Sequence, residues 1–192
     1  MTTGLVLAAG AGRRLGRVKP LLPWAGTTVA RWTVHRLREA GCERVVVAVG
    51  HRATEVAADV GGIAETVFCD RWDEGIGQTI ATAVRLLGSF DRLLLTPCDM
   101  PLVSSRSFSL LIERAPAVAV YAGTFGVPVC LTAAFRRDLT DLSGDCGAKS
   151  ALRRRRDELA EVAIPEATVD LDTVTDYEAA YRRFGVEPFD AG

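Results

Sequence analysis

Short apolar runs alternate along the chain with longer stretches in which apolar residues recur at helical spacing. A continuous run of roughly four to eight apolar residues is typical of a strand that is buried on both faces. One such run begins at Leu5, and further strands are predicted over residues 44–49, 65–68 and 92–96. Because helical stretches separate these strands, the pattern predicts βαβ units in a parallel sheet, with ligands beyond the carboxyl ends of the strands.

The helical stretches begin and end at residues that commonly cap helices. Thr27 and Thr28 can cap the first helix, and Gly41 follows its end. We expect helices over residues 28–40, 54–60, 76–87, 104–114 and 133–142, then one from the glycine loop 144–150 to about 159, and a last one from the capping segment 172–176 to 184.

The pattern changes after residue 114. Strands over 118–121 and 127–131 flank a turn that contains Gly123 and Gly126, which predicts a small antiparallel excursion, and two more strands are expected over 161–164 and 169–171. We find no linker or internal repeat. We therefore expect one α/β domain over residues 1–185, followed by a loose tail at 186–192.

Composition narrows the class of protein. The 192 residues are 48% hydrophobic and 24% charged, with a net charge of −1, which suits a soluble domain and disfavours a general nucleic-acid binder. No apolar stretch approaches the length of about 18 residues that a membrane span needs. The five cysteines are scattered without a C-x-x-C pair, so we expect reduced thiols and a cytoplasmic protein. With two histidines, any metal is expected to be a hard cation on carboxylates.

The loop after the first strand combines glycines with cationic side chains. Gly10 and Gly12 allow backbone N–H groups to approach an anion, while Arg14 and Lys19 add charge, so the loop predicts a phosphate site; a plain surface loop is the alternative. A P-loop is disfavoured because Arg17 follows Gly16. A dinucleotide fingerprint is disfavoured because its third glycine comes one residue late and no acid follows strand 44–49.

Acidic residues follow two of the predicted strands. Asp99 comes after strand 92–96 between Pro97 and Pro101, and Asp170 and Asp172 lie in or beside the late strand. One or two carboxylates plus substrate phosphates suffice for Mg²⁺, and this combination suits transfer at a nucleoside triphosphate without a protein nucleophile. The alternative is that Asp99 turns a corner or caps the following helix.

Several motifs together resemble one family. Residues 7–26 match L-A-A-G-x-x-x-R-x-G-x-x-K-x-L-L-P-x-x-G, and residues 99–103 resemble a D-x-P-L-V turn. Residues 72–77, 144–148 and 170–173 resemble W-x-x-G-x-G, G-D-x-G-A and D-I-D-T. The chain thus resembles the sugar-nucleotide-pyrophosphorylase-like nucleotidyltransferases, in particular the MobA-like molybdenum cofactor cytidylyltransferases.

This resemblance implies a Rossmann-like three-layer sandwich of the nucleotide-diphospho-sugar transferase type. It implies that Lys19, Arg14 and Asp99 are catalytic, and that Asp99 holds Mg²⁺ with Asp170 or Asp172. Ala9, where guanylyl-transferring relatives usually carry glycine, favours CTP over GTP. The nucleotide-binding residues implied are Leu7, Ala8, Ala9, Gly10, Gly12, Arg14, Lys19, Gly77, Thr79, Pro97 and Asp99.

The implied acceptor is the terminal phosphate of molybdopterin, with a molybdoenzyme as a possible partner. Four positions depart from the family pattern where the acceptor is expected: Val127 replaces histidine, Lys149 arginine, Thr79 serine and Val174 proline. Two alternatives therefore stay open. One keeps the chemistry with another phosphorylated acceptor, such as a sugar phosphate, or with GTP. The other is a noncatalytic protein that holds the cofactor as a chaperone.

Overall fold

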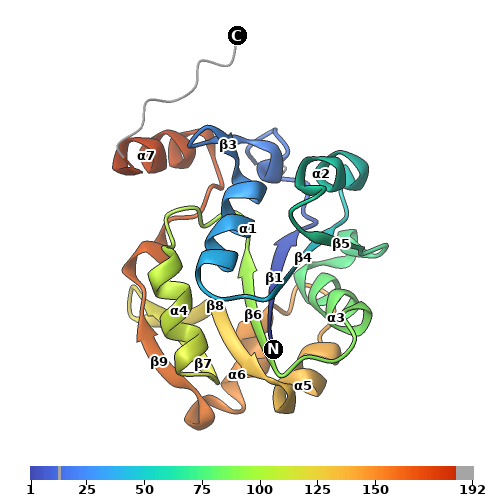
Figure 1. The fold of residues 1–192 in the computed structure, drawn as a ribbon, viewed down its shortest axis with the longest axis vertical. Coiled ribbons are helices and arrows are strands. Elements are labelled where there is room, and N and C mark those ends of the chain that lie inside the picture. The colour runs from blue at the N-terminus through green and yellow to red at the C-terminus, as the bar shows by residue number, and fades with distance from the viewer. Residues whose placement is uncertain (13, 185–192) are drawn as a thin grey trace.

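A seven-stranded sheet forms the centre of the computed structural model, which describes residues 1–12 and 14–184 (Figure 1). β8 runs antiparallel to both of its neighbours, and the other neighbouring pairs are parallel. This confirms the expected mostly parallel α/β domain with an antiparallel excursion; the expected tail at 186–192 lies outside the described residues. From edge to edge the strands are β5 (Glu65–Phe68), β4 (Arg44–Val49), β1 (Thr2–Ala8), β6 (Arg92–Pro97), β8 (Thr124–Thr132), β7 (Ala117–Tyr121) and β9 (Ala160–Ala163).

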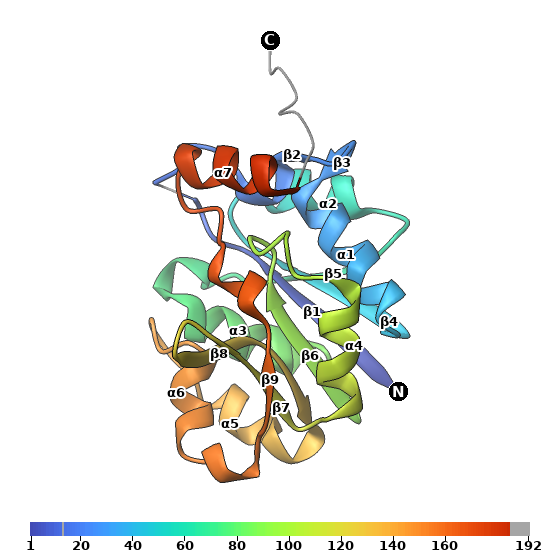
Figure 2. The ribbon, with the colours of Figure 1, turned by 90° about the vertical axis from the view of Figure 1, so that its left-hand side faces the viewer.

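Helices cover both faces of the sheet and complete three layers (Figure 2). Successive residues of β1 point to opposite faces, so Leu5 and Leu7 pack with one helix layer while Val6 and Ala8 pack with the other. One layer contains α1 (Val29–Glu39), α2 (Ala53–Val60) and α4 (Ser105–Glu113), and the other contains α3 (Ile76–Leu86), α5 (Arg136–Thr140) and α6 (Ala148–Arg153).

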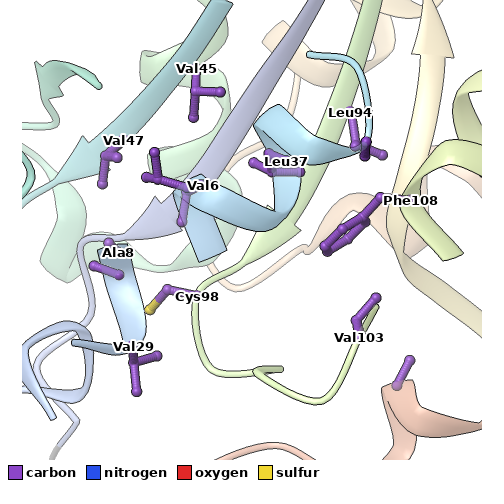
Figure 3. Close-up of a cluster of buried hydrophobic side chains, with 14 of the residues drawn as sticks. Val6, Ala8, Val29, Leu37, Val45, Val47, Leu94, Cys98, Val103 and Phe108 are labelled. Carbon is purple, nitrogen blue, oxygen red and sulfur yellow. The ribbon is translucent and has the colours of Figure 1, made fainter. Parts of the chain in front are cut away.

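The packing beneath α1 and α4 holds β1 firmly. Figure 3 shows Val6 of β1 with Leu37 of α1 and Phe108 of α4 among the buried apolar side chains. Val6 and Leu37 are fully buried, and Phe108 is 2% exposed. Burying a side chain of this size contributes about 1.5–3 kcal/mol. The glycine loop after β1 therefore starts from a rigid strand.

The last helix, α7 (Val174–Phe184), is tied to the short hairpin of β2 (Pro23–Trp24) and β3 (Thr27–Thr28). The Trp24 side chain is fully buried, with its ring centroid 4.6 Å from that of Tyr181. The hydroxyls of Tyr177 and Tyr181 both donate to the Pro23 carbonyl, at 2.6 and 2.7 Å. These contacts hold the end of the described chain beside the segment that follows the glycine loop.

Four expected elements are wrong in detail. The strand expected over 127–131 begins at Thr124, so Gly126 lies in β8 rather than in the turn. Residues 169–171 form no strand, because the Leu171 N–H donates to the Asp99 carbonyl at 3.0 Å, in a loop rather than in a sheet ladder. The stretch 133–142 divides into a 3₁₀ turn (Ala133–Phe135) and α5. The helix expected to reach 159 ends at Arg153, and a 3₁₀ turn (Arg156–Glu158) follows. There Arg155 leaves helical geometry while its guanidinium pairs with Asp138 and Glu158.

The structure has three further 3₁₀ turns among the described residues. η1 (Lys19–Leu21) precedes β2, η2 (Trp72–Glu74) precedes α3, and η5 (Pro165–Thr168) follows β9. In η1, Pro20 occupies an N-terminal position, where its missing N–H costs nothing, and the Leu22 N–H closes the turn onto the Lys19 carbonyl at 3.1 Å. This turn fixes the backbone from which the Lys19 side chain extends.

Candidate active site

Three segments that are far apart in sequence meet at one edge of the sheet. β1 and β6 are parallel neighbours with Leu7 opposite Pro97, so the glycine loop and Asp99 leave the sheet side by side. The segment before α7 crosses this edge and is held there by the hydrogen bond from Leu171 to the Asp99 carbonyl. The arrangement places Asp172 beside both other segments.

A cavity of about 280 Å³ opens where these segments meet. Most of the residues that the sequence predicts for the site line it. The lining consists of Leu7, Ala8, Gly10, Gly12, Arg14, Lys19, Pro20, Ile76, Pro97, Cys98, Asp99 and Asp172.

The glycine loop needs glycine at position 12. Gly12 has a φ of +59°, and a Cβ there would lie 2.6 Å from the Arg17 carbonyl oxygen. The N–H groups of Leu15 and Gly16 donate to the Gly12 carbonyl at 3.0 and 3.1 Å, which folds the loop back on itself. Side chains rarely adopt this left-handed conformation, so glycine here allows Arg14 and Lys19 to face the same cavity.

Charged side chains pair across the cavity. The Lys19 ammonium donates to Asp99 Oδ2 at 2.9 Å and to Asp172 Oδ1 at 2.5 Å. Arg14 Nη2 lies 2.7 Å from the other oxygen of Asp172. The Lys19 side chain is 15% exposed and that of Arg14 76%, so the lysine forms the inner part of the network and the arginine its outer part.

The network shifts the protonation of its members. Burial opposes the charge on Lys19, but attraction by Asp99 and hydrogen bonds to both carboxylates raise its pKa above the ordinary value. The hydrogen bond from Lys19 and the nearby charge of Arg14 lower the pKa of Asp172. Desolvation and the negative charges of Asp172 and Asp99 raise the pKa of Asp170. The surroundings of Asp170 and Asp172 thus shift their pKa values in opposite directions.

A smaller cavity of about 140 Å³ adjoins the first and shares Leu7, Gly10 and Ile76 with it. Ala9 and Thr79 line this second cavity, together with Trp72. Beside it the Trp72 ring lies 5.4 Å from that of His51. The structure therefore divides the predicted nucleotide-binding residues between two connected spaces.

Two predicted site residues lie outside these spaces. Gly77 is buried against the loop before α6, where its N–H donates to the Gly144 carbonyl at 2.8 Å and a Cβ would lie 2.5 Å from the Cys146 carbonyl oxygen. Glycine is therefore needed at position 77 because the start of α3 packs closely against the loop before α6. Asp170 is exposed and lines neither cavity, so the late carboxylate that reaches Lys19 is Asp172.

A third cavity, of about 220 Å³, lies on the other side of Leu7, Ile76 and Pro97. The β7–β8 hairpin and the start of α6 form its walls through Tyr121, Phe125 and Lys149. The Lys149 ammonium lies 5.3 Å from the Phe125 ring centroid and donates to the Thr124 hydroxyl. This third cavity is mostly apolar, with the ammonium as its cationic group.

Ile76 was missed by sequence reasoning, although it lines all three cavities. The available signal was a large apolar residue directly after Gly75 at the start of a helix, where an exposed apolar side chain is unexpected. Ile76 is 41% exposed. An exposed isoleucine between three cavities is suited to contact whatever fills them.

The described residues contain no group of three or more His, Cys, Asp and Glu side chains able to hold a metal ion. Two carboxylates do converge on one cationic atom, the Lys19 ammonium. Within the described part of the chain, no helix is long and apolar enough to cross a membrane.

A profile for the MobA-like NTP transferase domain matches residues 4–160. The chain belongs to this family. The family places it among the nucleotidyltransferases, which confirms the resemblance inferred from the motifs.

Two relatives are similar to this chain over most of their length. The chain is 29% identical to nicotine blue oxidoreductase of Paenarthrobacter nicotinovorans, covering 94% of this chain and 95% of that protein. It is 31% identical to molybdenum cofactor guanylyltransferase of Xanthomonas euvesicatoria, covering 79% and 76%. It also matches bifunctional GlmU proteins, but the alignment with that of Geobacter metallireducens spans only 24% of the relative.

Solved structures show the same fold. A nucleotidyl transferase from Methanothermobacter superposes with a TM-score of 0.83 at 27% identity, covering 96% of this chain and 97% of that one. A protein of Mycobacterium tuberculosis H37Rv, solved in complex with manganese, gives a TM-score of 0.72 at 26% identity, covering 93% and 96%. The chain therefore shares its fold with these proteins at 26–27% identity.

Proposed function

We propose that this protein is a Mg²⁺-dependent nucleotidyltransferase that moves CMP from CTP to the terminal phosphate of the molybdenum cofactor and releases pyrophosphate. The observation that carries the proposal is the meeting of Lys19, Asp99 and Asp172 beneath the glycine loop. A cavity lined by two cationic side chains and two carboxylates suits a metal-bound polyphosphate.

The cationic residues have separable tasks in this proposal. Lys19 is mostly buried and rises from a rigid turn, so its compact ammonium suits contact with phosphate oxygens near the reacting phosphorus. Arg14 is exposed at the mouth of the cavity and suits the outer phosphates. Backbone N–H groups of the glycine loop would complete the anion site.

The donor set of the cavity fits a divalent cation. Asp99 and Asp172 already point at one cationic atom, and hard cations such as Mg²⁺ are commonly held by one or two carboxylates plus substrate phosphates. When bound, the cation would neutralise charge on the α-phosphate and the leaving pyrophosphate. The manganese complex of the Mycobacterium tuberculosis relative supports a divalent cation in this fold.

The residues around the cavity would orient the reactants. In the proposed reaction an oxygen of the acceptor phosphate forms a bond to the α-phosphorus, and the bond from that phosphorus to the bridging oxygen of pyrophosphate breaks. The third cavity adjoins the first through Leu7, Ile76 and Pro97 and so suits the acceptor. Lys149 at its wall is suited to an acceptor phosphate.

The preference for CTP rests on Ala9, which lines the second cavity with Trp72 and stands where the motif of guanylyl-transferring relatives usually carries glycine. GTP remains the alternative, because one of the relatives is named a guanylyltransferase. Five free cysteines support a reducing compartment, so the proposal includes a cytoplasmic reaction whose product passes to a molybdoenzyme.

A direct assay tests this function. Purified protein with Mg²⁺, molybdenum cofactor and either CTP or GTP should release pyrophosphate, faster with CTP. Replacing the cofactor by a sugar phosphate tests the acceptor. Binding of the molybdenum cofactor without turnover on any acceptor would favour the chaperone alternative, and faster turnover with GTP would overturn the choice of nucleotide.

A second candidate, an oxidoreductase, is favoured by the match to nicotine blue oxidoreductase along almost the whole of both chains. One observation argues against a nicotinamide site of the Rossmann type: β4 ends at Val49 and is followed by Gly50 and His51, without the acidic residue that commonly binds the ribose. Oxidation of a reduced nicotinamide in the presence of a quinone-like dye, without pyrophosphate release in the first assay, would support this candidate instead.

A further inference from the structure

The Lys19 ammonium stands where the two carboxylates of the cavity converge. It lies 2.9 Å from Asp99 and 2.5 Å from Asp172, and these side chains are 22% and 26% exposed. Both aspartates are thus already paired with a cationic side chain of the protein itself. A divalent cation between the two carboxylates would have to share Asp172, whose two oxygens contact Lys19 and Arg14, and would lie beside the Lys19 ammonium.

We propose that Lys19 acts as a built-in substitute for the metal, so that the free protein binds a divalent cation weakly and nucleotide binding releases both carboxylates for it. This inference rests on the proposed function, because it assigns the order in which nucleotide and metal enter the same site. A triphosphate offers the ammonium an alternative set of anionic oxygens in the same cavity.

Arg14 shows why the position of Lys19 matters more than its charge. Arg14 also contacts Asp172, at 2.7 Å, but it approaches the outer oxygen and is 76% exposed. Arg14 contacts Asp172 but not Asp99, whereas Lys19 bridges both carboxylates. Removing either side chain changes the net charge equally, so the two variants separate local competition from general attraction.

The proposal makes nucleotide and metal binding cooperative. If the triphosphate draws Lys19 away, the nucleotide increases the affinity for the metal, and the metal must increase the affinity for the nucleotide by the same factor. Without Lys19 no side chain would bridge the two carboxylates in either state, and the exposed Arg14 would remain at Asp172. Much of the cooperativity should then disappear.

The test measures Mn²⁺ binding to the full chain by electron paramagnetic resonance, with Mn²⁺ alone and with a non-hydrolysable α,β-methylene analogue of CTP. Lys19→Met should lower the Kd for Mn²⁺ alone by roughly tenfold or more, because a neighbouring positive charge is removed. Arg14→Met should lower it by less than about threefold, because exposed charges are screened. In the wild type the analogue should tighten Mn²⁺ binding much more than it does in Lys19→Met.

An independent measurement uses the wild type and does not depend on the folding of a variant. The chain contains only two lysines, Lys19 and Lys149, so ¹⁵N-lysine labelling gives two side-chain signals, which Lys149→Met assigns. Mg²⁺ with the analogue should shift the Lys19 signal, whereas the same concentration of Mg²⁺ alone should leave it unchanged.

Unchanged or weaker Mn²⁺ binding in folded Lys19→Met, or equal effects of the Lys19 and Arg14 variants, would overturn the proposal. So would a Lys19 signal that responds fully to Mg²⁺ alone. These results are distinct from failure of the proposed function: turnover without competition at Lys19 removes only this inference, and competition without turnover on any acceptor removes only the enzymatic assignment.

Discussion

The two lysines of the chain occupy neighbouring cavities but opposite environments. Lys19 is held between two carboxylates, whereas Lys149 contacts a hydroxyl and the face of an aromatic ring. Within the described residues, no carboxylate pairs with Lys149. The first cavity therefore balances its own charge and the third presents an unneutralised cation to a ligand.

This difference suggests that the two cavities bind different ligands at one edge of the sheet. The cavity with paired charges suits a substrate that brings both negative charge and a metal, because both sets of protein charges then find partners. The mostly apolar cavity suits a ligand with a large organic body and an anionic group. The shared walls, Leu7, Ile76 and Pro97, would bring the two ligands together.

The largest effect is expected from Asp99→Asn, which removes one of the two converging carboxylates. Turnover should fall by roughly 10²–10³, as is usual when one electrostatic contact to the reacting groups is lost. Far-UV circular dichroism should be unchanged, because Asp99 lies in a loop.

Asp170→Asn is the matched control, since Asp170 is exposed and lines neither the first nor the second cavity. Its turnover should stay within about tenfold of the wild type. Equal losses in the two variants would mean that Asp170 rather than Asp172 completes the metal site.

A pair of lysine variants separates the two cavities. Lys19→Met should lower kcat/KM for CTP by roughly 100-fold, because the triphosphate loses a charged contact. Lys149→Met should raise KM for the acceptor by about tenfold while KM for CTP stays within about twofold. Steady-state kinetics with each substrate varied in turn measures both. If Lys149→Met changed KM for CTP instead, the third cavity would not be the acceptor site.

The middle of the sheet could be predicted because β1, β4 and β6 are buried on both faces. The runs over 44–49 and 92–96 are rich in Val and Leu, and their observed bounds agree within a residue. Elements near the end of the chain were harder, because tertiary contacts override the local pattern there. Leu171 is fully buried and Val169 and Leu171 alternate with acidic residues as in a strand, yet the Leu171 N–H donates to a loop carbonyl.

The phosphate-binding part of the candidate site could be predicted because one loop contains both the glycines and the cationic side chains. The grouping of Lys19 with Asp99 follows from parallel neighbouring strands. The choice between Asp170 and Asp172 could not be made, because it depends on where α7 is anchored by Tyr177 and Tyr181. The prediction that Gly77 binds the nucleotide is not supported by its contacts, because this glycine packs against a neighbouring loop. A sequence alone does not distinguish a glycine that packs against a loop from one that contacts a ligand.

A smaller effect is expected from the glycine loop, where Gly12 and Gly10 form a matched pair. Gly12→Ala should lower the free energy of unfolding by about 1–2 kcal/mol, because alanine disfavours a φ of +59°. It should also raise KM for CTP, since the new Cβ would push against the Arg17 carbonyl.

A Cβ on Gly10 meets nothing within 4 Å, and Gly10 lies outside the left-handed region. Gly10→Ala should therefore change the free energy of unfolding by less than about 0.5 kcal/mol. Chemical denaturation of both variants measures the difference, and equal destabilisation would show that the loop conformation does not depend on Gly12.

The smallest effect concerns the pH dependence of stability at Asp172. Its pKa is lowered in the folded state, chiefly by the hydrogen bond from Lys19, so its ionised form stabilises the fold above the ordinary Asp pKa of about 3.9. That contribution is lost as the pH falls through the lowered pKa. Asp172→Asn should thus cost about 1 kcal/mol or less at neutral pH, and the difference from the wild type should shrink below about pH 4.

Urea denaturation between neutral pH and about pH 3 measures this difference. Asp141→Asn is the control, because that carboxylate is 62% exposed and lies 3.6 Å from Arg137, so little change is expected at any pH. A cost at Asp172 that stays constant through acidic pH would show that the shape of its hydrogen bonds, rather than its charge, holds the segment before α7. Only the charge-dependent result agrees with a carboxylate that Lys19 could release to a metal.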